Sequence, residues 1–226
     1  ERPAFNGTYQ ALVARGISVF APNVRGSSGF GKKFVNLDNG ALRVDAVKDI
    51  KSTIDHLIGS GIADRAKIGI MGGSYGGYMV NWIAGQWSQP WKCLVNHAGV
   101  FDTRVMAYST DIQAFSEAQF RGLSRLAAET AGRFDPSDAV AKWKVPMLVI
   151  HGARDYRVPL DQGIAAHNAA RRAGVPTEML LFPDENHWVL KPQNSVQWYA
   201  TVETWMRRWT GDGADSAHSQ AVAPIK

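Results

Sequence analysis

The sequence predicts an α/β fold, with a mostly parallel sheet covered by helices on both faces. Short apolar runs typical of strands alternate with longer segments in which apolar residues recur at the helical period. Such alternation favours a parallel sheet, because each crossover between parallel strands usually contains a helix. The strand-type runs lie at residues 17–21, 67–71, 93–96, 145–150 and 178–182, and the helical segments at 5–15, 42–58, 78–86, 161–173 and 196–209.

Length and composition favour one globular domain. The chain has 226 residues, 45% of them hydrophobic, which is enough to bury the core of a single α/β unit. We expect this domain to span residues 1–210. Residues 211–226 are rich in Gly, Ala, Ser and Asp without any period, which predicts a disordered tail. The irregular stretch 102–144 is expected to contribute elements that contact a substrate.

Several classes of function are disfavoured by composition. The net charge is +5, but Lys and Arg are scattered, so a nucleic-acid partner is not predicted. No apolar stretch approaches the ~18 residues of a membrane span. Cys93 is the single cysteine, which excludes an internal disulfide and favours the cytoplasm, with a periplasmic or secreted location left open. No spacing of His, Cys and Asp resembles a metal site, so neither a metal nor another cofactor is predicted.

The segment KIGIMGGSYGGYMV, residues 67–80, carries the strongest chemical signal. An apolar strand-type run enters a glycine cluster around Ser74, and a helical segment follows. Gly-x-Ser-x-Gly at a strand-to-helix turn is the nucleophile elbow of α/β-hydrolases, which exposes the serine hydroxyl above the sheet. The backbone N–H of Tyr75 would then point toward a developing oxyanion. The alternative is a glycine-rich turn that contains a serine by chance.

Two further residues make the elbow interpretation stronger. Asp155 follows the strand-type run at 145–150, and His187 follows the run at 178–182. The order Ser, Asp, His is that of α/β-hydrolases, with each residue just beyond the carboxyl end of a strand. The sequence therefore predicts an α/β-hydrolase fold with Ser74, Asp155 and His187 as catalytic triad.

At these residues the chain resembles the prolyl oligopeptidase family of serine peptidases, in particular its acylaminoacyl-peptidase-like branch. The resemblance covers residues 5–209. Besides GGSYGG, the matching motifs are NVRGSSGFG at 23–31, HGARDYRVP at 151–159 and DENHW at 184–188. The chain departs from the family at residues 39–41, where Asn-Gly-Ala stands in place of Trp-Gly-Gly.

The resemblance implies roles for residues outside the triad. Arg157 occupies the position of an arginine that binds a substrate backbone carbonyl, although a surface arginine is an equal alternative. Phe101 and Tyr108 fall where the family builds its P1 side-chain pocket, although aromatic residues in such a region are usually core. The residues themselves, apart from the resemblance, indicate that Arg25 pairs with a carboxylate. Asp45 and Asp49, four residues apart on a helix, could suggest a carboxylate pair, but a solvated or Arg-paired face is the expected interpretation.

The resemblance also implies parts that precede this sequence. The family carries an HGG-type loop, which supplies the second oxyanion donor, upstream of where this chain begins. The strand before that loop is expected between the runs at 17–21 and 67–71, so the N-terminal strands of the fold are apparently missing. Five strands would remain of the family's eight. An upstream β-propeller domain is expected in the parent protein, and a homo-oligomer is left open.

The function expected from residues and resemblance is that of a serine hydrolase. It would cleave peptide bonds of short peptides, N-acylated or dipeptidyl, through an acyl-serine intermediate. A carboxylesterase that acts on short-chain acyl esters has the same triad and is the first alternative. An inactive fragment that lacks the oxyanion loop is the second.

Overall fold

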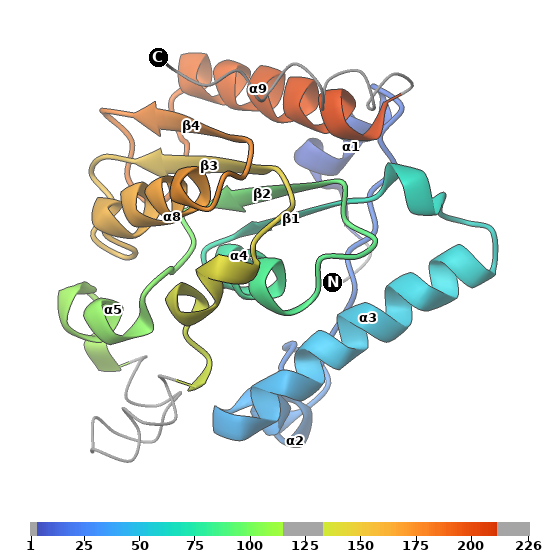
Figure 1. Cartoon of the computed structure of the whole chain (residues 1–226), viewed down its shortest axis with the longest axis horizontal. Coiled ribbons are helices and arrows are strands. Elements are labelled where there is room, and N and C mark those ends of the chain that lie inside the picture. Colours follow the sequence, from blue (N-terminus) through green and yellow to red (C-terminus); the bar gives the residue numbers. More distant parts are fainter. Residues whose placement is uncertain (1–3, 115–132, 212–226) are drawn as a thin grey trace. The chain divides into compact units, whose positions relative to one another are not determined.

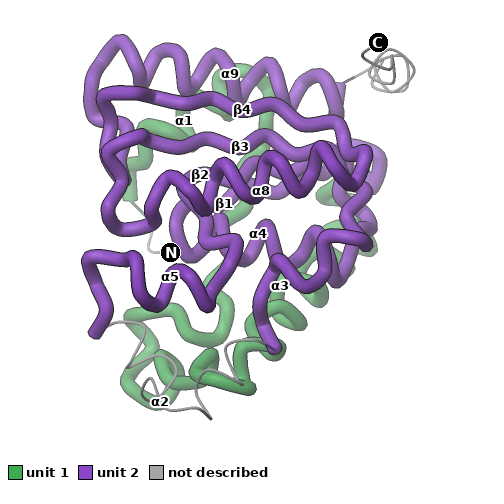
Figure 2. Tube along the Cα trace, turned by 60° about the vertical axis from the view of Figure 1, so that its left-hand side comes forward, with its two compact units in different colours: residues 1–63 green, residues 64–226 purple. Residues whose placement is uncertain are grey.

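The computed structural model describes residues 4–114 and 133–211. The chain divides into two compact units, residues 1–63 and 64–226 (Figure 2). The predicted tail, apart from Gly211, and the middle of the stretch 102–144 lie outside the described residues. In the described part of the chain, no helix is both long and apolar enough to cross a membrane.

The first unit is built from helices and turns. Helix α1, Gly7–Val13, begins after Asn6, whose side chain accepts a hydrogen bond from the Tyr9 N–H. The long helix of the unit is α3, Arg43–Gly59, close to the predicted segment 42–58. Three short elements precede it: α2 (Lys32–Val35), η1 (Asn36–Asp38) and η2 (Gly40–Leu42).

The predicted strand at residues 17–21 is not formed. Residues 17–20 have no regular secondary structure, and the Phe20 side chain is exposed. A strand is stabilised by hydrogen bonds to a neighbour, and among the described residues no strand pairs with this run. The prediction of five strands was therefore wrong by one, because an apolar run by itself does not provide a pairing partner.

The Arg25 prediction is confirmed within the first unit. The guanidinium Nη2 lies 2.6 Å from Asp49 Oδ1 on α3, and Nη1 lies 3.4 Å from Asp45 Oδ2. The side-chain hydrogen bonds from Arg25 hold the pKa of Asp49 below its usual value. Gly26 follows with φ 97°, and a Cβ there would lie 2.4 Å from Asp38 Cγ, so the turn needs glycine.

The second unit contains a four-stranded parallel sheet in the order β1-β2-β3-β4 (Figure 1). Each strand lies within three residues of a predicted run at both ends. The strands are β1 (Gly69–Gly73), β2 (Cys93–His97), β3 (Met147–Gly152) and β4 (Thr177–Phe182). Within the described residues of this unit, the helices and 3-10 turns include η3 (Arg65–Lys67), α4 (Tyr75–Gln86), α5 (Thr103–Ser109), η4 (Pro136–Lys142), α8 (Leu160–Arg172) and α9 (Pro192–Thr210).

Helices cover both faces of this sheet, as predicted. On one face, Asn96 of β2 bonds Asn81 of α4, and Gly163 of α8 lies against the His151 ring. On the other face, the Cys93 and Met206 sulfur atoms lie 3.4 Å apart, which brings α9 onto β2. Successive residues of a strand point to opposite faces, so β2 alternates between α4 and α9. The inner strands β2 and β3 are accordingly buried along almost their whole length.

The α4 helix packs closely on η4 because Gly85 lacks a side chain. A Cβ at Gly85 would lie 2.4 Å from the Ala139 Cβ, far inside contact distance. Gly76, on the same helix, has no atom within 4 Å of the corresponding position. Alanine substitutions at these two glycines of the same helix therefore form a matched pair, one at a crowded position and one at an open position.

Gly85→Ala should lower the free energy of unfolding by about 1–3 kcal/mol, the usual cost of overpacking. Gly76→Ala should leave it unchanged or raise it by up to about 1 kcal/mol, because alanine favours the helix. Urea denaturation monitored by circular dichroism measures both. Equal effects of the two substitutions would contradict the close packing of α4 on η4.

Candidate active site

Ser74 occupies the single residue between β1 and α4. Its φ is 57° and its ψ −116°, a strained backbone conformation for a residue with a side chain. Two hydrogen bonds hold it: the Ser74 N–H donates to the His97 carbonyl at 2.9 Å, and the Ser74 carbonyl accepts from the Tyr78 N–H at 2.9 Å. This is the sharp strand-to-helix turn that the sequence predicted.

The glycines of the motif allow backbone segments to approach. A Cβ at Gly72 would lie 2.2 Å from the Gly76 carbonyl oxygen, and one at Gly77 would lie 2.6 Å from the Gly99 Cα. Any larger residue at either position would push α4 away from the ends of β1 and β2. The turn that strains Ser74 is therefore available only with glycine at these positions.

Asp155 lies in the loop after β3 and is almost fully buried, with 3% of its surface exposed. Its Oδ1 accepts hydrogen bonds from the N–H groups of Arg157 and Val158, both at 2.9 Å. Its Oδ2 lies 2.7 Å from His187 Nδ1. The loop amides thus fix the carboxylate, and one oxygen faces the imidazole.

His187 lies in the loop after β4, beside the Asp155 loop. The Ala153 N–H donates to the Phe182 carbonyl, and the Arg154 N–H donates to the Glu185 carbonyl at 2.9 Å. Trp188, largely exposed, packs edge-on against the His187 ring with 5.0 Å between the ring centroids.

The structure brings Asp155 and His187 into contact and sets Ser74 at the same edge of the sheet. Parallel strands place their carboxyl ends together, which explains why residues after β1, β3 and β4 share this edge. Within residues 4–114 and 133–211, no hydrogen bond joins Ser74 to His187. A nucleophile–base hydrogen bond that is open without substrate often tightens when substrate binds.

Two further histidines, His151 and His97, lie near the Asp155 carboxylate. His151 Nε2 donates to the Val158 carbonyl at 2.8 Å and lies 3.5 Å from Asp155 Oδ2. His97, at the end of β2, packs against Trp198. Burial lowers the pKa of His151 and lowers the pKa of His97 to about 4. Both imidazoles are therefore neutral near pH 7 and add no positive charge beside Asp155.

Comparison with known proteins identifies the family. The sequence pattern of the prolyl oligopeptidase family matches residues 3–213. The chain belongs to the prolyl oligopeptidase family. It is 38% identical over 202 residues to a dipeptidyl-peptidase 5 of Porphyromonas endodontalis, covering 88% of this chain and 29% of that protein. It is 39% identical over 202 residues to a dipeptidyl-peptidase 5 of Schizosaccharomyces pombe, covering 87% and 29%.

Solved structures of similar proteins support the fold. The acylaminoacyl peptidase of Pyrococcus horikoshii superposes with a TM-score of 0.78 at 27% identity, covering 84% of this chain and 32% of that chain. A puromycin-hydrolyzing peptidase of Mycobacterium tuberculosis gives 0.79 at 24% identity over 90% and 31%, which supports the fold. The fold is that of the α/β-hydrolases, as predicted. The chain spans less than a third of the length of the relatives it matches.

The three residues predicted to contact substrate in this prolyl oligopeptidase-family chain differ in burial and in partners. Arg157 follows Asp155 by two residues, and its Nε donates to Asp111 Oδ1 at 2.6 Å. This hydrogen bond raises the pKa of the Arg157 guanidinium. Tyr108 on α5 is 74% exposed, whereas the Phe101 ring is buried edge-on against Trp143. The substrate roles of all three residues stay predictions.

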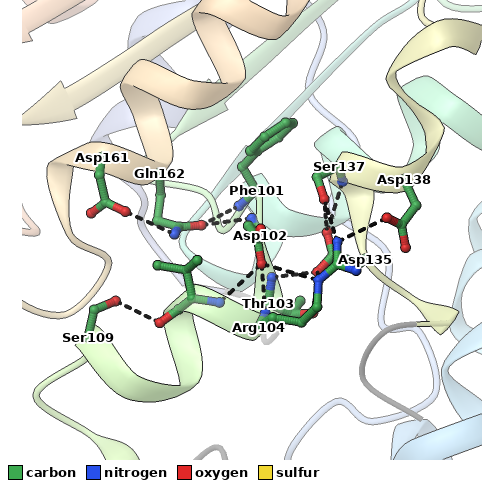
Figure 3. Close-up of polar contacts among 11 residues, drawn as sticks. Phe101, Asp102, Thr103, Arg104, Ser109, Asp135, Ser137, Asp138, Asp161 and Gln162 are labelled. Carbon is green, nitrogen blue, oxygen red and sulfur yellow. Dashed lines mark hydrogen bonds and ion pairs between the residues drawn. The ribbon is translucent and has the colours of Figure 1, made fainter. Parts of the chain in front are cut away.

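A polar network that the sequence did not reveal supports α5 (Figure 3). Gln162, buried on α8, accepts hydrogen bonds through Oε1 from the N–H groups of Phe101 and Asp102. The buried Asp135 carboxylate accepts from the N–H and hydroxyl of Thr103 and from the N–H and hydroxyl of Ser137. Asp135 precedes a proline as a helix cap would, but no sequence signal connects it to Thr103.

Tyr75, the predicted oxyanion donor, is the first residue of α4. At that position the backbone N–H points out of the start of the helix, where anions are favoured. Across the described ranges, no group of three or more His, Cys, Asp or Glu side chains could hold a metal ion.

Stability should fall as the pH decreases from 7 to 5. His97 has an ordinary pKa of 6.5 when unfolded but about 4 when folded, so the unfolded chain takes up the proton first. His97 alone should cost about 2 kcal/mol over this range. Urea denaturation at pH 7 and pH 5 measures the loss, and His97→Gln should reduce it by that amount. Equal losses in both proteins would contradict a His97 that stays neutral in the folded chain.

Proposed function

We propose that this chain is the catalytic part of a serine peptidase that hydrolyses short peptides through an acyl-serine intermediate. The observation that carries the proposal is the strained turn of Ser74 at the sheet edge where Asp155 and His187 form a 2.7 Å contact. A serine held in such a turn has its hydroxyl exposed for attack. The family membership supports the same reaction class.

In the proposed reaction, Ser74 Oγ attacks the substrate carbonyl while His187 Nε2 accepts the hydroxyl proton. The imidazolium then gives this proton to the departing amine, which leaves Ser74 acylated. A water molecule, deprotonated by His187, attacks the acyl-serine; the acyl–Oγ bond breaks, the imidazolium returns the proton to Ser74 Oγ, and the acid is released. The Tyr75 N–H would stabilise the oxyanion in both steps.

The role of Asp155 follows from its hydrogen bonds. Its Oδ1 is occupied by two loop amides, and Oδ2 faces His187 Nδ1. An ionised carboxylate can only accept hydrogen bonds, so Nδ1 of His187 carries a proton. Nε2 then keeps the lone pair that accepts the proton of the Ser74 hydroxyl. The same carboxylate stabilises the imidazolium that forms during attack.

Peptides are favoured over esters as substrates. The curated relatives are named dipeptidyl-peptidase 5, and a solved structure of similar fold is named acylaminoacyl peptidase. Both names describe cleavage near the N-terminus of a peptide. We therefore propose dipeptidyl or N-acylated short peptides as the substrate class. An HGG-type loop upstream of this sequence is proposed as the second oxyanion donor, and a β-propeller domain as an upstream partner.

An organophosphate should modify Ser74 in the full-length protein, because only an activated serine reacts with it. Mass spectrometry of the digested protein locates the adduct. Ser74→Ala should abolish both labelling and turnover while leaving the free energy of unfolding nearly unchanged. Ser52→Ala, at an exposed serine on α3, is the matched control and should keep both activities. An adduct on a different serine, or none at all, would contradict the triad assignment.

The substrate class is tested with three chromogenic compounds. A dipeptide p-nitroanilide with a free N-terminus, an N-acetylated dipeptide p-nitroanilide and p-nitrophenyl butyrate are compared at equal enzyme concentration. Cleavage of at least one anilide is expected. Ester hydrolysis without any amide cleavage would favour the carboxylesterase, and no burst with any compound would favour an inactive chain.

A further inference from the structure

A second buried carboxylate lies in the loop that carries His187. Glu185 precedes His187 by two residues and is only 3% exposed. An ionised carboxylate is costly to bury unless hydrogen bonds replace its water. Its partners therefore indicate what it does.

The Glu185 side chain is bonded to the start of α9. Oε1 accepts from the Lys191 N–H at 2.9 Å and from Asn194 Nδ2 at 2.7 Å. Oε2 accepts from the Leu190 N–H at 3.2 Å. Lys191 occupies the N-cap position of α9, so the carboxylate joins the His187 loop to the first turn of this helix.

The Glu185 backbone is bonded to the other catalytic loop. Its carbonyl accepts from the N–H of Arg154, the residue before Asp155. Gly152 makes this approach feasible, since a Cβ there would lie 2.6 Å from the Glu185 carbonyl oxygen and 2.2 Å from that of Asn186. Glu185 therefore connects three parts: the Asp155 loop, the His187 loop and α9.

The carboxylate remains charged in this position. Burial alone would raise the pKa of Glu185, but the hydrogen bonds from Asn194, Lys191 and Leu190 hold it below its usual value. Hydrogen bonds to a charged acceptor are stronger than those between neutral groups. A neutral amide at this position would present an NH₂ group to one of these donors.

We propose that Glu185 is a positioning residue for His187. By bonding the loop that carries His187 both to the Asp155 loop and to the start of α9, Glu185 sets the distance between the imidazole and Ser74. The inference rests on the proposed function of the triad. Asp155 holds the Nδ1 side of the ring, and Glu185 holds the backbone that carries it. A plain helix cap would affect stability alone, whereas a positioning residue also affects the chemical step.

Glu185→Gln is the test, made in the full-length protein. The second-order rate constant for organophosphate labelling of Ser74 should fall about 10- to 100-fold, because displacement of a catalytic group by about 1 Å has effects of this size. With a peptide substrate, kcat should fall by a similar factor and KM should stay unchanged. All rates are measured well below the unfolding temperature, with folding verified by circular dichroism.

The matched control is Glu178→Gln, on β4 of the same strand–loop–helix unit. Glu178 is half-exposed and pairs with Arg208, so its labelling rate should equal that of the wild type. Should Glu185→Gln fail to fold, Asn194→Ala removes one donor to the same carboxylate. It should lower the labelling rate in the same direction by a smaller factor.

The outcomes separate the two proposals. Wild-type protein that is not labelled at Ser74 would overturn the proposed function. Labelled wild type together with a folded Glu185→Gln, or Asn194→Ala, that reacts at the wild-type rate would overturn the positioning role alone. A lower labelling rate of either folded variant, with KM unchanged, supports the positioning role of Glu185.

Discussion

Parallel pairing of the four strands is the constraint on which the candidate site depends. It brings the carboxyl ends of β1, β3 and β4 to one edge of the sheet, and Ser74, Asp155 and His187 are the residues placed there. Each comes from a different loop, so none could reach the others without the shared edge. The apolar faces of β2 and β3, covered by α4, α8 and α9, stabilise this arrangement through burial.

Contacts within the loops fix the side chains of the candidate site more closely than the sheet alone does. Glycines at 72 and 77 let α4 start immediately after β1, which forces Ser74 into its strained conformation. Backbone amides hold the Asp155 carboxylate, and the Glu185 carboxylate holds the loop that carries His187. The buried Gln162 and Asp135 do the same for α5. Rigid polar contacts of this kind are what a preorganised site requires.

Much of this could be predicted from the sequence because the signals are local. Four of the apolar runs form strands as predicted, and Gly-x-Ser-x-Gly correctly indicated the turn at Ser74. Residues 17–21 were assigned wrongly because strand formation depends on a partner elsewhere. The roles of Gln162, Asp135 and Glu185 were missed, although Glu185 lies within the DENHW motif, because the sequence does not show which backbone N–H groups a buried side chain will bind. The Arg157–Asp111 ion pair was missed for the same reason.

The site depends on the hydrogen bond between Asp155 and His187, which proton NMR tests most directly. A proton held between an imidazole nitrogen and a buried carboxylate resonates far downfield of backbone amides. We expect one such signal from His187 Nδ1, absent in Asp155→Ala and in His187→Gln but retained in His97→Gln. A signal that persists in Asp155→Ala, or that disappears only in His97→Gln, would contradict the pairing of these two residues.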